Sequence, residues 1–129
     1  MKRILVVDDE PTNTLLVKRC LESVGNYEVF TENRGSLAVQ AARKHHPHLI
    51  LLDIMMPDMP GSDVAAALHE DSALRHIKVV FLTSMIAKGQ ETRSGKDIVM
   101  AKPISTKELV AVIEQELGQS MSDSTSIRG

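Results

Sequence analysis

The segment LILLDIMMPDMPG, residues 49–61, decides the fold of this chain. Four aliphatic residues lead directly into a carboxylate, Asp53, and then into a loop that contains two prolines and a glycine. A short, continuous apolar run of this kind is typical of a strand that is buried on both faces of a sheet. An ionised aspartate at the end of such a strand is costly unless nearby groups compensate its charge. The rest of the sequence must therefore supply those groups.

Four further apolar runs of strand length alternate with segments of helical periodicity. The predicted strands are residues 4–7, 27–31, 49–52, 79–82 and 98–101. The predicted helices are residues 11–24, 35–44, 62–69 and 105–117. Strands that alternate with helices form a parallel sheet with helices on both faces and right-handed crossovers. The expected fold class is therefore α/β, with a three-layer (βα)₅ pattern.

Each predicted helix has an apolar face that should pack on the sheet. The residues expected to point inward are Leu16, Val17, Cys20, Leu21 and Val24, then Leu37, Ala38 and Ala41, then Val64, Ala65 and Leu68, and finally Leu109, Val112, Ile113 and Leu117. Ser105 and Glu108 form a capping box before the last helix. The segment 87–96 contains two glycines and is expected to be a short, poorly anchored helix or a loop. Residues 1–118 are expected to form the domain, and the polar residues 119–129 a disordered tail.

Length and composition restrict the possible classes of protein. The chain has 129 residues, 43% of them hydrophobic and 25% charged, which suits one soluble domain. The net charge of −2 gives no general attraction to nucleic acid or to an anionic membrane. Cys20 is the single cysteine, which excludes an intramolecular disulfide and fits a reducing compartment. The sequence shows neither a signal peptide nor an apolar run of membrane-spanning length, so we expect a cytoplasmic protein.

Polar residues follow four of the five predicted strands. Asp8 and Asp9 follow the first strand, and Asp53 follows the third. Thr83 follows the fourth strand and Lys102 the fifth. The carboxyl ends of parallel strands meet at one edge of a sheet, where ligands of such folds bind. Each feature alone is also compatible with a solvated turn or a helix cap, but together they predict one site.

The three carboxylates of this site would repel one another. Two unit charges that are 4 Å apart interact by about 4 kcal/mol at an effective dielectric constant near 20. Lys102 supplies one positive charge, and an all-oxygen site with open positions suits Mg²⁺. A carboxylate beside a metal ion, a lysine and a hydroxyl is also a suitable acceptor for a phosphoryl group. The sequence thus predicts that Asp53 acts as a nucleophile and forms an acyl phosphate.

Four segments in this order and spacing resemble the receiver domain of bacterial two-component response regulators. They are VVDDE at 6–10, LLDIMMPDMPG at 51–61, FLTS at 81–84 and AKPIS at 101–105, and the resemblance covers residues 2–117. It implies a flavodoxin-like fold with the strand order 2-1-3-4-5. It also implies a signalling module rather than an enzyme, one that promotes only its own phosphorylation and dephosphorylation. Its partners would be a histidine kinase or phosphotransfer protein and a downstream effector protein or fused output domain.

The resemblance also assigns a role to each site residue. Asp53 would accept the phosphoryl group, and Asp8, Asp9, Asp53 and the backbone carbonyl of Met55 would hold Mg²⁺. Thr83 would supply the switch hydroxyl. Lys102 would contact the phosphoryl group, and its bond to Pro103 would be cis.

Two features depart from the family pattern. Val99 occupies a position that in this family is commonly Tyr or Phe, and the stretch from Thr83 to Lys102 is a few residues short. Both changes fall on one face, formed by the weak fourth helix at 87–96, the fifth strand at 98–101 and the last helix at 105–117, so we expect an atypical output face. Met55 and Met85 follow Asp53 and Thr83 by two residues; they either shield the acyl phosphate from water or are tolerated surface methionines.

Other classes of protein fit less well. The aspartates after the first strand would repel a flavin phosphate, and the chain lacks the G-x-G-x-x-G motif of dinucleotide-binding domains. A haloacid-dehalogenase-type phosphatase would have its nucleophile after the first strand.

The run KHHPH at 44–48 does not have the spacing of a zinc site and is expected to be a polar turn. Cys20 is expected to be a core residue. The remaining alternative is a pseudo-receiver, a protein-interaction module that acts without phosphorylation. The cognate kinase, the output and any fused domain are not specified by the sequence.

Overall fold

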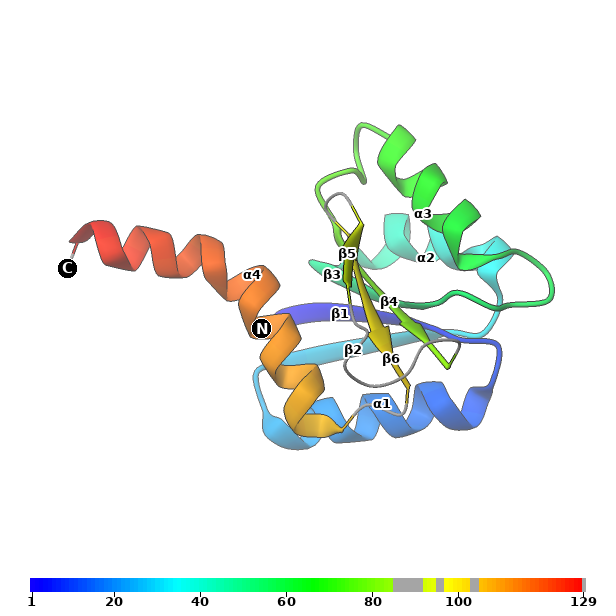
Figure 1. The fold of residues 1–129 in the computed structure, drawn as a ribbon, viewed down its shortest axis with the longest axis horizontal. Coiled ribbons are helices and arrows are strands. Elements are labelled where there is room, and N and C mark those ends of the chain that lie inside the picture. The colour runs from blue at the N-terminus through cyan, green and yellow to red at the C-terminus, as the bar shows by residue number, and fades with distance from the viewer. Residues whose placement is uncertain (85–91, 95–96, 103–104, 129) are drawn as a thin grey trace.

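A computed structural model describes residues 1–84, 92–94, 97–102 and 105–128, with the side chains of 92–94 and 119–128 left undescribed. The elements follow one another in the order β1 (Lys2–Val7), α1 (Pro11–Val24), β2 (Tyr27–Glu32), the 3₁₀ helix η1 (Gly35–Leu37), α2 (Ala38–His45), β3 (Leu49–Asp53), α3 (Gly61–Glu70), β4 (Lys78–Thr83), β5 (Thr92–Ser94), β6 (Asp97–Ala101) and α4 (Thr106–Arg128). The helices flank a central sheet on its two faces (Figure 1).

The sheet has the strand order β2-β1-β3-β4-β6-β5. Its first five strands in this order are parallel, which confirms the predicted topology of a doubly wound α/β fold. All five of these strands were predicted, and the observed strands differ by at most two residues at each end. Asp53 and Thr83 are the last residues of β3 and β4 rather than the first residues after them.

The strand at the edge of the sheet, β5, was not predicted. Thr92–Ser94 pair antiparallel with β6, where the sequence suggested a short helix or a loop. The physical reason is that β6 would otherwise leave a row of backbone groups unpaired at the edge of the sheet. The rest of the predicted weak helix lies outside the described residues.

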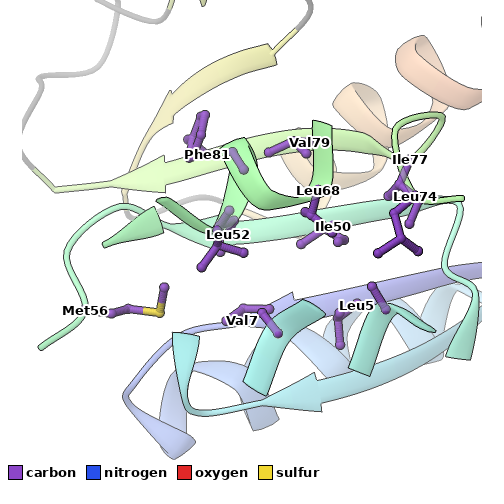
Figure 2. Packing of buried hydrophobic residues seen from close by; sticks show 14 residues of the cluster. Leu5, Val7, Ile50, Leu52, Met56, Leu68, Leu74, Ile77, Val79 and Phe81 are labelled. Atoms are coloured by element: carbon purple, nitrogen blue, oxygen red, sulfur yellow. The ribbon is translucent and has the colours of Figure 1, made fainter. Parts of the chain in front are cut away.

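Two apolar clusters, one on each face of the sheet, form the core. The first packs α2 and α3 against the sheet, and Figure 2 shows its residues, including Leu5, Ile50 and Phe81 between the layers. The second packs α1 and α4 against the other face, around Leu21 and Ile113. The stretch Leu49–Leu52, which contributes to both clusters, is fully buried, as the lack of alternation in its sequence predicted.

The predicted helix faces are confirmed for α3 and α4 but are partly wrong for α1 and α2. Leu16 and Val24 are 60% and 50% exposed, and Leu37 is also exposed. The buried stripe of α1 instead centres on Leu21 and Thr14, whose hydroxyl donates a hydrogen bond to the carbonyl of Pro11. A threonine can replace an apolar residue there because its hydroxyl is satisfied within the first turn.

Helix α4 begins with the predicted capping box. The amide of Glu108 donates to the hydroxyl of Ser105, and the amide of Ser105 donates to the carboxylate of Glu108, both at 3.1 Å. The helix continues to Arg128, past Gly118, where the sequence predicts that the domain gives way to a tail. Its last turns extend beyond the sheet (Figure 1). In the part of the chain that the structure describes, none of the helices is long and apolar enough to cross a membrane.

Candidate functional site

Three carboxylates meet at the carboxyl ends of β1 and β3. One oxygen from each of Asp8, Asp9 and Asp53 lies within 4.8 Å of the others. Asp8 and Asp53 are buried, at 5% and 7% exposure, and Asp9 is half-buried. Among the described residues this is the one group of three or more potential ligands able to hold a metal ion. The structure therefore brings together the three acidic residues that the strand ends predicted.

Lys102, one residue after β6, reaches into this cluster. Its Nζ lies 2.8 Å from Oδ2 of Asp8 and 3.5 Å from Oδ1 of Asp53. Its amide donates a 2.7 Å hydrogen bond to the carbonyl of Thr83, which fixes the end of β6 beside the end of β4. The lysine thus offsets part of the negative charge, as the sequence predicted. Burial alone would lower the pKa of Lys102, but its hydrogen bond to Asp8 and the charges of both carboxylates outweigh burial and raise it.

Asp53 has an environment that disfavours its ionised form. Burial raises the pKa of Asp53, and the charge of Asp8 raises it further, while Lys102 and the amide of Met55 oppose the rise. The Met55 amide lies 3.4 Å from Oδ1 of Asp53. A carboxylate that is partly desolvated and short of positive charge gains most from an added cation. The site is therefore electrostatically incomplete without one.

Asp8 is held in place by groups that the sequence analysis did not identify. The amide of Glu10 donates to its Oδ1 at 3.0 Å, and Nδ2 of Asn13 approaches its Oδ2 at 3.4 Å. Nδ2 of Asn33, from the loop after β2, donates to the backbone carbonyl of Asp8 at 2.9 Å. No sequence pattern points to Asn33, because it comes from a different loop and contacts backbone rather than the carboxylate.

Gly61, at the start of α3, allows the loop after Asp53 to turn back on itself. The amide of Gly61 donates to the carbonyl of Ile54 at 2.9 Å. A Cβ at this position would collide with the backbone carbonyl of Asp53. Only glycine allows so close an approach. The glycine at the end of the opening segment is thus needed to shape the site.

The structure describes some of the remaining predicted site residues and not others. Thr83 is buried at the end of β4, next to Leu82, which pairs with Asp53 in the sheet. Met55 is 62% exposed beside the site. Val99, on β6, pairs with Phe81 and packs on the first core cluster. Met85 and Pro103, and with them the predicted cis bond and half of the proposed shielding, lie outside the described residues.

The three histidines of the run 45–48 contribute to packing and backbone geometry. His45 stacks on Phe30 with ring centroids 3.9 Å apart, and His46 ends α2 in the left-handed conformation. Nδ1 of His48 accepts a hydrogen bond from the amide of Arg3 at 2.9 Å. These roles agree with a polar turn into β3. Cys20 is half-buried rather than a full core residue.

Comparison with known proteins agrees with this geometry. Residues 4–114 match the model of the response regulator receiver domain. The polar-differentiation response regulator DivK of Brucella ovis is 37% identical over 120 residues, which cover 91% of this chain and 97% of that protein. The crystallised chemotaxis protein CheY4 of Vibrio cholerae has a TM-score of 0.79 at 25% identity, covering 91% of this chain and 99% of that one. A response regulator from Desulfuromonas acetoxidans has a TM-score of 0.78 at 26% identity, with coverages of 92% and 98%.

Proposed function

This chain belongs to the response regulator receiver domain family, and from that premise we propose that Asp53 accepts a phosphoryl group from a histidine kinase or phosphotransfer protein. The observation that carries the proposal is the meeting of Asp8, Asp9 and Asp53 around Lys102 at one edge of the sheet. Membership of this family identifies the chain as a signalling module. The assignment of phosphorylation to this chain depends on these side chains.

The transfer is a displacement at phosphorus. A carboxylate oxygen of Asp53 attacks the phosphorus of a phosphohistidine, a P–O bond forms and the P–N bond breaks. The electron pair of the broken bond stays on the imidazole nitrogen, which takes up a proton. Lys102 can turn from Asp53 to the incoming phosphoryl oxygens because its Nζ already lies within 3.5 Å of the accepting carboxylate.

The residues present fit a magnesium ion. Three carboxylates offer oxygen ligands within 4.8 Å of one another, and hard divalent cations prefer such oxygens. We assign Asp8, Asp9, Asp53 and the backbone carbonyl of Met55 as the ligands. When bound, the ion would neutralise charge on the transferring oxygens. Lys102 would then be released from part of its pairing with Asp8.

The signal would leave through the atypical output face, which includes β6 and α4. Thr83 is the proposed switch hydroxyl, because it ends β4 directly beside Lys102. Val99 replaces the usual aromatic residue on β6, so this chain must relay the switch without an aromatic rotamer change there. A downstream effector protein or a fused output domain would receive the signal. We further propose that the receiver unit ends at Gly118.

Intact mass after incubation with acetyl phosphate and magnesium tests the proposal. The wild-type chain should gain the mass of one phosphoryl group, and Asp53→Asn should gain none. The alternative is a pseudo-receiver, which acts without phosphorylation. In that case the ion pair between Lys102 and Asp8 would only stabilise the fold. No mass gain in the wild type, with the fold intact by circular dichroism, would favour that alternative.

Nuclear magnetic resonance with beryllofluoride and magnesium tests the atypical output face. We expect shifts that spread through the site and the core beside Val99. Large shifts confined to Thr83 and the β6–α4 face, as an aromatic switch would give, would contradict this part of the proposal.

A further inference from the structure

The helical segment that begins with η1 receives its cap from a distant loop. Neither Arg34 nor Leu37, the residues that precede η1 and α2, forms a side-chain cap. Instead, Asp58 of the loop after β3 accepts hydrogen bonds from two successive amides, from Gly35 at 3.2 Å and from Ser36 at 3.0 Å. A carboxylate at the amino end of a helical segment is stabilised by these free amides and by the helix dipole. The loop that carries Met55 is therefore fastened to the start of η1.

The same short segment also holds the other acidic loop. Nδ2 of Asn33 donates to the backbone carbonyl of Asp8 at 2.9 Å and lies 3.0 Å from the hydroxyl of Thr14 on α1. The 33–36 segment thus contacts both loops of the acidic cluster, the one after β1 and the one after β3. The two loops belong to neighbouring strands. A single segment bridges them from the side.

The contact between the 33–36 segment and the loop after β3 is close. Gly35 is buried, and a Cβ at this position would lie 2.6 Å from the carbonyl oxygen of Met59 and 3.0 Å from Cε of Met56. Met56 in turn is buried in the first core cluster, as Figure 2 shows. The loop is therefore held at two points, by the hydrogen bonds of Asp58 to Gly35 and Ser36 and by the packing of Met56 in the core. Such a loop has little freedom to change its distance from the loop after β1.

We infer that the 33–36 segment is a clamp that sets the separation of the two halves of the acidic cluster, with Asp58 and Asn33 as its positioning residues. The inference rests on the proposed function, because it assigns these residues to the same magnesium site. Neither residue contacts the ion in this assignment. Each acts through the loop that it holds, Asp58 through the loop of Asp53 and Met55, and Asn33 through that of Asp8 and Asp9.

The clamp predicts a specific defect. When outer residues that orient metal ligands are removed, metal affinity commonly falls by about 10- to 100-fold. Asp58 acts one step further away, through a loop that Met56 and Gly61 also restrain, so we expect Asp58→Ala to weaken magnesium binding by about 3- to 10-fold. Asn33→Ala should have a similar effect, and the double variant should lose little more affinity than either single variant, because breaking either attachment releases the clamp.

The test measures magnesium binding by calorimetry in the unphosphorylated protein, together with hydrogen exchange of the Gly35 and Ser36 amides without metal. Asp71→Ala is the matched control. Asp71 also accepts a backbone hydrogen bond, from the amide of Ala73 at 2.8 Å, and it forms an ion pair with Arg43 at 2.6 Å, but it follows α3 on the connection to the amino end of β4, away from the carboxyl ends of the strands. Asp71→Ala should lose stability and keep the wild-type magnesium affinity. Asp58→Glu, which keeps the charge but lengthens the side chain, should recover only part of the affinity.

The outcomes separate the two proposals. Weaker magnesium binding and faster exchange at Gly35 and Ser36 in Asp58→Ala, with the control unchanged, support the clamp. Wild-type affinity in a folded Asp58→Ala variant overturns it and leaves the proposed function intact. Equal loss of affinity in Asp58→Ala and Asp71→Ala overturns it as well, because the effect would then be one of general stability. If the wild-type chain binds no magnesium, the proposed function itself fails.

Discussion

The Nζ atom of Lys102 lies 2.8 Å from Oδ2 of Asp8, which makes Asp8 its nearest charged partner. Its distance to Oδ1 of Asp53 is longer, at 3.5 Å. The lysine therefore compensates mainly the carboxylate that follows β1, and it leaves the proposed phosphoacceptor with the weaker pairing. This division of one positive charge between two buried carboxylates determines how the site should respond to mutation, pH and metal.

Lys102→Ala should destabilise the magnesium-free protein. The change leaves the buried Asp8 carboxylate without its cation, and breaking a partly buried ion pair of this kind costs about 1–3 kcal/mol. Urea unfolding in the presence of a chelator measures the loss. Addition of magnesium should recover part of it, since a cation would again stand beside Asp8 and Asp53. Equal losses with and without magnesium would contradict this account.

Asp53→Asn should have the opposite effect and stabilise the magnesium-free protein at neutral pH. The folded-state pKa of Asp53 lies above its ordinary value, mainly because of burial. For a carboxylic acid this means that ionisation opposes folding. The penalty is present above the folded-state pKa and disappears as the pH falls below the ordinary carboxyl value. We expect a gain on the order of 1 kcal/mol at pH 7 that fades in acid.

Thermal unfolding of Asp53→Asn in chelator checks this prediction. A gain of about 1 kcal/mol corresponds to a rise of roughly 3–5 °C in the midpoint for a chain of this size. Asp63→Asn, at an exposed acid in the first turn of α3, is the control and should give no gain. A lower midpoint for Asp53→Asn at pH 7 would show that Asp53 is adequately compensated without metal.

Most of the fold and the centre of the site could be predicted from the sequence, because both depend on local patterns. Continuous apolar runs predicted the buried strands, and the polar residues at their ends predicted the meeting of Asp8, Asp9, Asp53 and Lys102. The capping box predicted the start of α4 to within one residue. In each case, the deciding residues are neighbours in the sequence or lie at equivalent ends of parallel strands.

The rest depends on contacts between distant segments, which no local pattern encodes. The side chains of Asp58 and Asn33 have their partners 19 or more residues away, on other segments of the chain. Leu16 fits the apolar period of α1 but is exposed, because the stripe that reaches the sheet is narrower than the apolar face. Thr92–Ser94 form a strand because the edge of β6 needs a partner, whereas their own sequence favours neither helix nor strand strongly.

Gly61→Ala should destabilise the protein and weaken magnesium binding together. The added methyl group would collide with the backbone of Asp53 and Ile54, which cannot move without shifting the site. We expect a loss of about 1–3 kcal/mol, which is typical of overpacking. Gly118→Ala is the matched control, because its nearest contact would be a flexible Glu114 oxygen at 3.6 Å. That change should be neutral or stabilising by up to about 1 kcal/mol, as expected inside a helix.

Tyr27→Phe should loosen the attachment of α4 to the sheet in a pH-dependent way. The buried Tyr27 hydroxyl donates to Oε2 of Glu114 at 2.5 Å, and Nζ of Lys2 lies 2.9 Å from the same oxygen. A hydrogen bond to a partly exposed carboxylate contributes about 1 kcal/mol, so the variant should lose roughly that amount at pH 7. Urea unfolding of the wild type and variant measures the difference.

The pH dependence of this loss follows from Glu114. The Tyr27 hydroxyl, and after it Lys2, hold the pKa of Glu114 below its ordinary value. A carboxylate with a depressed folded-state pKa contributes stability above its ordinary pKa and loses that contribution as the pH falls through the folded-state value. The difference between wild type and Tyr27→Phe should therefore shrink in acid. In a Glu114→Gln background it should be smaller at pH 7 and constant with pH, since a neutral amide cannot lose a charge. A difference that persists unchanged at low pH in the wild-type background would show that Tyr27 contributes through packing alone.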